Sequence, residues 1–392
     1  MSFSILGGLT GKGRNSLLID VESGAVTVAL YSEEKLAHRE SDAVLYVKRI
    51  FVPRTKTFSS AHAKKEFEEV FVECRKATEK FGRISNIHVS VGAPWVYTRS
   101  FNLTREWETP VEFTKSIEDS MFKEKESKNV YFEYFRAFLG NTVLPVRVKI
   151  SDKKQIFVNG YPFPSYEEKK GTQLSVVGEE YIFIEWMLGL LEKNAEYFGN
   201  PTPHFFSYNT AIPFLKDESE YLFVVIGAYA TEVGYVDRLS QSIKILSGFP
   251  VGERTLVEAL ESSGKMTSVE AESILNMYND ERLHPNFSEA KKKVLTETAS
   301  LWVKKFEEVL HAVSVEAKIP RKVFLVPFER ARFAKRLLSE ENYAQPSLPE
   351  KSWNVILASE FCADKTFLSP LPHPRLELLL LYLAHVFQGK TT

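Results

Sequence analysis

Two similar strand–turn–strand patterns, far apart in the chain, constrain its fold most strongly. The first covers residues 16–32, SLLIDVESGAVTVALYS: an apolar run ends in Asp20, the turn residues Ser23 and Gly24 follow, and a segment rich in β-branched residues comes next. The second covers residues 221–246, where an apolar run, a turn and an alternating run follow in the same order. This recurrence predicts a duplicated fold whose halves face each other across a cleft.

The first of these turns has the residue types of an anion-binding site. Small residues after a strand leave backbone N–H groups free to face an anion. Asp20, at the strand end, could hold a metal ion through water. A plain hairpin with an acidic residue at its edge remains the alternative.

The glycine-rich run before this hairpin is not a P-loop. A P-loop reads G-x-x-x-x-G-K-[ST] and lies between a strand and a helix. Here Leu6 stands five residues before Gly11, Gly13 follows Lys12, and a strand follows the run. We expect a mobile N-terminal arm instead.

The composition excludes several classes of protein. A chain of 392 residues is long enough for two or more domains, and its 50 basic and 51 acidic residues give no overall reason to bind nucleic acid. Cys74 and Cys362 are too few and too far apart for a disulfide scaffold or a thiolate zinc site. The eight histidines show no H-x-x-x-H spacing, and there is no G-x-S-x-G segment of a hydrolase. Without a signal peptide or a stretch of ~20 apolar residues, we expect a cytoplasmic protein.

In the order and spacing of its segments, the sequence resembles the actin-like ATPase superfamily, and within it the FtsA/PilM branch. In that superfamily two β-hairpins clamp the nucleotide phosphates. DVESGAV at residues 20–26 is similar to the first hairpin, and VIGAYAT at residues 225–231 is similar to the second. Other segments that resemble the branch are residues 86–103, 156–176, 247–264 and 268–275.

The resemblance implies an α/β class and a two-lobed actin-like fold, which is a duplicated ribonuclease H-like fold with an inserted α+β subdomain. The expected organisation is the N-terminal part of the first lobe at residues 1–83, the insert at 84–192, a return and linker at 193–220, the second lobe at 221–345, and a C-terminal segment returning to the first lobe at 346–392.

The resemblance also implies a site for ATP and Mg²⁺ between the two hairpins. The residues carried over to the phosphate site are Asp20, Ser23, Gly24, Gly227 and Thr231. Asp20 would reach the metal ion through water.

Three departures weaken this site. Glu22 stands where the family usually has glycine, which places a negative charge near the phosphates. Val225 replaces an aspartate that helps to hold the metal ion and the attacking water. Pro327 and Phe328 replace a glycine pair of the adenosine region, so the backbone there loses an N–H group and close access. We therefore expect ATP binding to be weak or lost, and hydrolysis to be very weak or absent.

The resemblance implies a scaffold at the cytoplasmic face of the membrane, in pilus assembly or cell division. Its partner would be the cytoplasmic tail of an inner-membrane protein or a cytoskeletal protein, and self-assembly is also implied. Two alternatives stay open. One is an active ATPase or phosphotransferase in which Glu22 or Glu232 replaces the missing aspartate. The other is an interaction module without nucleotide.

The C-terminal segment 375–388 has helical preference and is apolar almost all round. A membrane anchor of the FtsA type normally has a polar face rich in Lys and Arg, and this segment has only Arg375. We expect a buried helix of the first lobe, with membrane contact as the alternative.

Overall fold

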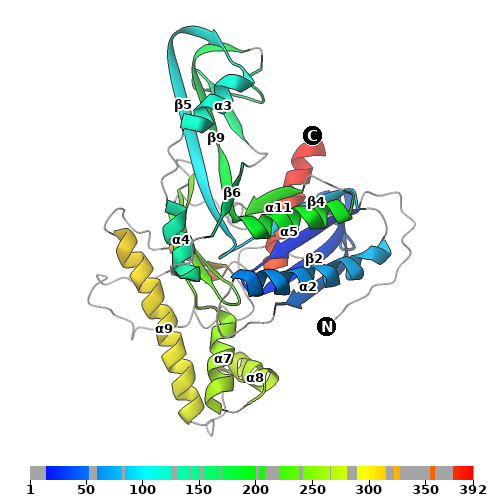
Figure 1. Cartoon of the computed structure of the whole chain (residues 1–392), viewed down its shortest axis with the longest axis vertical. Coiled ribbons are helices and arrows are strands. Elements are labelled where there is room, and N and C mark those ends of the chain that lie inside the picture. Colours follow the sequence, from blue (N-terminus) through cyan, green and yellow to red (C-terminus); the bar gives the residue numbers. More distant parts are fainter. Residues whose placement is uncertain are drawn as a thin grey trace.

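The computed structural model describes most of the chain (Figure 1). The described residues are 15–52, 60–81, 84–124, 130–140, 144–150, 154–167, 169–199, 203–207, 220–237, 242–264, 266–279, 289–314, 322–326, 354–357 and 374–391. The expected N-terminal arm, most of the linker before residue 220, the replaced glycine pair at Pro327 and Phe328, and Cys362 lie outside them.

The first sheet has the strand order β10-β4-β1-β2-β3. β1 pairs antiparallel with β2, and β2 antiparallel with β3, whereas β4 runs parallel to both β1 and β10. These strands are β1 (Asn15–Val21), β2 (Ala25–Ser32), β3 (Val44–Phe51), β4 (Asn86–Val91) and β10 (His204–Ser207).

Part of the second sheet repeats this topology. The order β15-β14-β11-β12-β13 has the same antiparallel pairs, β11 with β12 and β12 with β13, and the same parallel pairs, β11 with β14 and β14 with β15. The strands are β11 (Glu220–Ile226), β12 (Thr231–Asp237), β13 (Ser242–Phe249), β14 (Lys322–Val326) and β15 (Asn354–Leu357). The predicted α/β class and duplicated fold are therefore confirmed.

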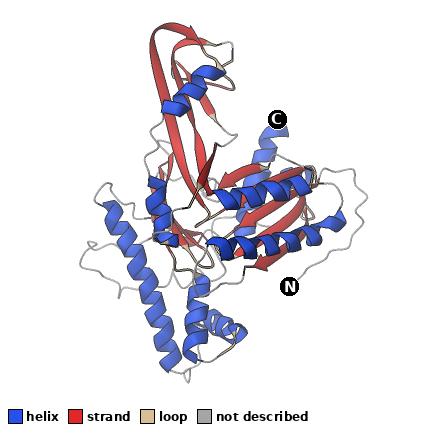
Figure 2. Cartoon of the chain, viewed as in Figure 1, coloured by secondary structure: helices blue, strands red, loops and turns tan. Residues whose placement is uncertain are grey.

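Helices cover both faces of the first sheet, which explains why β1 and β2 are apolar almost throughout (Figures 1 and 2). On one face lie α2 (Ser60–Thr78), which a short 3-10 turn (Glu79–Phe81) continues, and α5 (Glu185–Tyr197). Phe67 of α2 packs there with its ring centroid 5.0 Å from that of Trp95. On the other face the ring centroid of Tyr31, on β2, lies 6.3 Å from that of Phe387, on α11 (Pro374–Thr391).

The helix α11 is a core element of the first lobe, as its sequence predicts. Its buried side chains are Leu376, Leu378, Leu379, Leu380, Tyr382, Leu383, Ala384 and Phe387. Near its end the Gln388 amide donates a hydrogen bond of 2.9 Å to the carbonyl oxygen of Ala37, in α1 (Glu33–Ala37). Within the described residues, the chain has no helix with the length and apolar character needed to cross a membrane.

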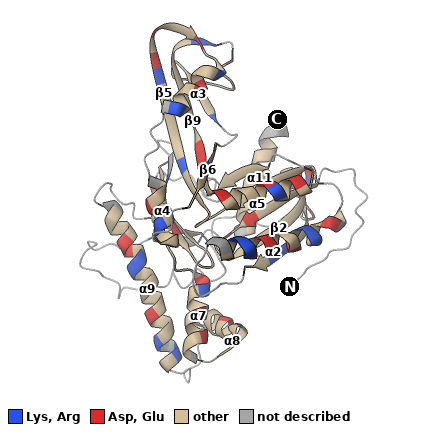
Figure 3. Cartoon of the chain, viewed as in Figure 1, with Lys and Arg blue, Asp and Glu red and all other residues tan. Residues whose placement is uncertain are grey.

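The second lobe has a core of its own between its sheet and the helices α7 (Glu253–Gly264), α8 (Ser268–Asn279) and α9 (Glu289–Ser314). Trp302 and Phe306 of α9 are fully buried in it, together with Leu222 and Val224 of β11. The exposed side of α9 carries charges of both signs, as does α2 (Figure 3).

The insert projects away from the two lobes as a long β-hairpin with one helix beside it, and its second helix lies at the base of the hairpin (Figures 1 and 2). Its small separate core includes Phe101, Phe113, Met121, Leu174 and Val176. The elements are β5 (Val96–Glu112), α3 (Lys115–Glu124), α4 (Val130–Leu139), β6 (Val146–Ile150), β7 (Gln155–Val158), β8 (Tyr161–Phe163) and β9 (Lys170–Ile184). Strand β5 joins the second sheet beside β13. At the ends of the expected 84–192 insert, β4 and α5 lie with the first sheet, and the exact domain boundaries stay a prediction.

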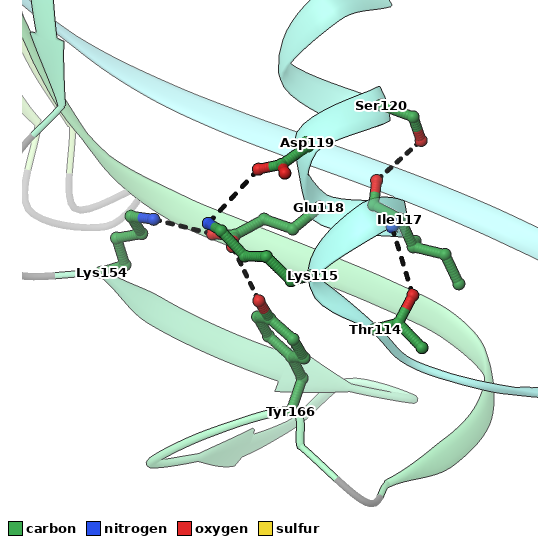
Figure 4. Close-up of polar contacts among 8 residues, drawn as sticks. All are labelled: Thr114, Lys115, Ile117, Glu118, Asp119, Ser120, Lys154 and Tyr166. Carbon is green, nitrogen blue, oxygen red and sulfur yellow. Dashed lines mark hydrogen bonds and ion pairs between the residues drawn. The ribbon is translucent and has the colours of Figure 1, made fainter.

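A buried carboxylate ties α3 to the rest of the insert (Figure 4). Glu118 accepts hydrogen bonds from Lys115 at 2.7 Å, from Tyr166 at 2.8 Å and from Lys154 at 2.8 Å. Burial by itself raises the pKa of Glu118, but the bonds from these three residues outweigh it and lower the pKa to about 2. The ionised carboxylate therefore stabilises the folded insert.

Acidification is expected to destabilise the insert. Because the folded pKa of Glu118 is below the ordinary value of 4.5, the unfolded state binds more protons between pH 4.5 and about 2. The stabilisation is complete above this window and is lost as pH falls through it. Glu118→Gln should lower the protection of α3 at pH 7, which is its hydrogen-exchange rate relative to the intrinsic rate at the same pH, and should make this protection largely independent of pH in the window. Protection of α3 that falls with pH as steeply as in the wild type would contradict this assignment.

Candidate functional site

The turns of the two repeated hairpins lie directly against each other. The Ser23 hydroxyl oxygen, between β1 and β2, accepts a hydrogen bond of 2.9 Å from the backbone N–H of Tyr229, between β11 and β12. A Cβ atom on Gly24 would lie 2.5 Å from the Cδ2 atom of Tyr229 and 3.0 Å from the Cβ atom of Ala228. Residues from the two halves of the chain that the sequence assigns to one site are thus brought together.

The second turn is docked on the start of α7 through backbone groups. The Gly227 N–H donates to the carbonyl oxygen of Ala230 at 2.7 Å, which closes the turn. The Glu253 and Arg254 N–H groups donate to the carbonyl oxygens of Gly227 at 3.1 Å and Ala228 at 2.7 Å. Free N–H groups at a helix start attract anions, but these two already have acceptors inside the protein.

Asp20 and Glu22 are both buried beside the first turn, each 1% exposed. The Asp20 position lies between Thr27 of β2 and Ser90 of β4 in the sheet register. Both carboxylate oxygens of Glu22 accept from the same Nη2 atom of Arg49, on β3, at 3.1 and 3.2 Å. The negative charge that the sequence adds at this turn is therefore paired with an arginine.

Val225 and Thr231 flank the second turn, and neither offers a free polar group. Val225 is 6% exposed and brings no carboxylate. The Thr231 hydroxyl is fully buried, donates to the carbonyl oxygen of Val251 at 2.6 Å, and accepts from the indole Nε1–H of Trp302 at 3.0 Å. The local role of Thr231 in this structure is to join the turn to α9 and to the segment before α7.

Glu232 is held by the insert. Its carboxylate accepts a hydrogen bond of 2.6 Å from the hydroxyl of Tyr134, on α4, and only 3% of Glu232 is exposed. Burial, together with Glu232 itself, raises the pKa of the Tyr134 hydroxyl well above its ordinary value. Glu232 therefore has a structural partner on α4, which leaves it poorly suited to replace the missing aspartate.

The sequence reasoning missed Tyr229, which is central to the site. Its hydroxyl interacts electrostatically with Arg254 and Glu258 of α7. Burial and the nearby Glu258 raise the pKa of Tyr229, while the interaction with Arg254 lowers it, and the net shift is upward. The only signal for it was a bulky aromatic residue within a turn of otherwise small residues, GAYA.

The two turns contact each other at the place where the resemblance puts the phosphates. The Tyr229 ring lies against Gly24, and the Tyr229 N–H group is bonded to Ser23. Among the residues that the structure describes, no three His, Cys, Asp or Glu side chains are grouped closely enough to hold a metal ion.

Comparison with known proteins identifies the fold. No protein-family model matches the sequence, and no curated protein matches it significantly. The structure of a PilM–PilN type IV pilus biogenesis complex matches with a TM-score of 0.50 at 13% identity, over 95% of this chain and 98% of that chain. A glucokinase from Balamuthia mandrillaris matches with a TM-score of 0.44 at 9% identity, over 96% and 95% of the two chains. EutJ, an ethanolamine utilization protein from Carboxydothermus hydrogenoformans, matches with a TM-score of 0.40 at 10% identity, over 94% and 89%. With its duplicated sheets and its match to the pilus protein along nearly the whole chain, this chain has the actin-like ATPase fold.

Proposed function

We propose that this chain is an actin-fold scaffold that works through protein contacts rather than nucleotide turnover, at the cytoplasmic face of a membrane in pilus assembly or cell division. Its fold match to a pilus biogenesis protein supports the pilus role in particular. The scaffold would bind ATP weakly or not at all.

The observation that carries the proposal is that two of the predicted phosphate residues, Ser23 and Thr231, are hydrogen-bonded to other groups of the protein. Ser23 holds the Tyr229 N–H, and Thr231 holds both Val251 and Trp302. Hydrolysis also needs a carboxylate to orient and deprotonate water, and the valine at position 225 has no group that can do this.

The proposed partner is the cytoplasmic tail of a membrane protein. The matched pilus protein is part of a complex with PilN, which supports a role in an assembly of that kind. Because α11 is packed into the first lobe, we propose that any contact with the membrane is made through this partner.

MgATP is expected to bind the wild-type chain weakly in calorimetry or to give no saturable heat, and the chain should show no ATP turnover above background. Asp20→Ala should leave that background unchanged, because no chemistry depends on the carboxylate. Saturable turnover that Asp20→Ala abolishes would overturn the proposal in favour of an ATPase or phosphotransferase.

Crosslinking in cells, followed by membrane isolation, should recover the wild-type chain with an inner-membrane protein.

A further inference from the structure

Tyr229 is the residue at which both hairpin turns and α7 meet. We propose that Tyr229 is an internal latch: it fills the space between the turns and holds the two lobes together without a ligand. The inference rests on the proposed function, since a scaffold that does not use nucleotide needs another means to keep its lobes closed.

The contact with the first lobe depends on Ser23 and Gly24. Ser23 supplies the acceptor for the Tyr229 N–H at 2.9 Å. Gly24 lets the ring approach the backbone, since a Cβ atom there would meet two ring carbons at 2.5 and 2.6 Å. Its φ angle is outside the left-handed region, so the requirement for glycine at this position comes from the ring and not from the backbone conformation.

The contact with the second lobe fixes the other end of the side chain. The Tyr229 hydroxyl interacts electrostatically with Arg254 and Glu258 of α7. Arg254 is in turn anchored on α8, where it contacts Glu272 and donates to the Ser268 hydroxyl at 3.0 Å. Held at its backbone, ring and hydroxyl, Tyr229 is a fixed bridge between the lobes.

A fixed bridge at this point competes with any phosphate ligand. A triphosphate between the turns would need N–H groups that now have internal acceptors, at Tyr229, Glu253 and Arg254. Such a ligand could bind only to molecules in which the latch is open, and its apparent affinity falls in proportion to that open fraction. The same contact therefore holds the lobes together and competes with a triphosphate for the space between the turns.

The test compares Tyr229→Ala and Ser23→Ala with Tyr161→Ala, which removes a tyrosine that is 71% exposed in the insert. The measurement is hydrogen exchange of the full chain without nucleotide, read at residues 22–25 and 227–230. We expect exchange in both turns to become about tenfold faster in Ser23→Ala, which loses the acceptor of one hydrogen bond. Exchange should also become faster in Tyr229→Ala, which keeps the backbone N–H group but loses the ring that lies against Gly24. The Tyr161→Ala variant should exchange like the wild type.

If both turns exchange at the wild-type rate in Ser23→Ala and in Tyr229→Ala, the proposal of a latch is wrong. If Tyr229→Ala fails to fold, the Ser23→Ala variant decides, because it removes only a hydroxyl group. These measurements contain no nucleotide, so their outcome is separate from the wild-type MgATP titration, which tests the proposed function.

Discussion

Replacing Arg49 by methionine is expected to lower the free energy of unfolding by about 3 kcal/mol, because it removes the cation from a buried carboxylate. Both oxygens of Glu22 contact the guanidinium, and only 1% of Glu22 is exposed. Methionine keeps most of the apolar stem, so the loss should come from the charge rather than from packing. Chemical denaturation, followed by circular dichroism, measures the change.

The matched control is the double variant Glu22→Gln with Arg49→Met. Neutral glutamine has almost the shape of glutamate, so the double variant should recover more than half of the lost stability. A double variant as unstable as Arg49→Met alone would show that the charge of Glu22 is not the cause. Either way, the comparison reports on the first turn itself, since Glu22 adjoins Ser23 and its backbone carbonyl oxygen accepts from the Trp95 indole at 2.8 Å.

The topology could be predicted from sequence because each hairpin carries its own local signals. In residues 16–32 and 221–237 the strands are continuous apolar or alternating runs, and small residues mark the turns between them. Two copies of this unit are enough to predict duplication. The structure adds that β4 and β14 have equivalent positions in the two sheets, each parallel to the first strand of its hairpin.

The state of the site could not be predicted, because it depends on partners that are distant in sequence. The cation for Glu22 comes from β3, 27 residues away, and the donor for Thr231 comes from α9, 71 residues away. No local pattern specifies such pairs, since they follow from strand register and helix packing. The same holds for Tyr229, whose acceptor on Ser23 is 206 residues away. Sequence therefore placed the residues in one region but left open whether they serve a ligand or each other.

Trp302→Ala is expected to lower the free energy of unfolding by about 3 to 5 kcal/mol, which would make it among the most destabilising single changes in the second lobe. Trp302 is fully buried, with its ring stacked on Phe306 at 5.5 Å between centroids and edge-on to Phe249 at 5.9 Å. Alanine would leave a cavity beneath the second turn. Thermal and chemical denaturation measure the loss.

Trp302→Phe separates packing from hydrogen bonding, because it keeps an aromatic ring and removes only the donor to Thr231. We expect Trp302→Phe to lower the free energy of unfolding less than Trp302→Ala does. In a double-mutant cycle, Trp302→Phe and Thr231→Val should show a coupling energy of about 1 kcal/mol. Strictly additive effects would mean that the indole does not hold the Thr231 hydroxyl. The Thr231 hydroxyl would then be available to bind a phosphate. Of the two predicted phosphate residues, Ser23 and Thr231, only Ser23 would still support a scaffold that does not use nucleotide. Coupling of the expected size would instead indicate that Thr231 is retained for the stability of the turn.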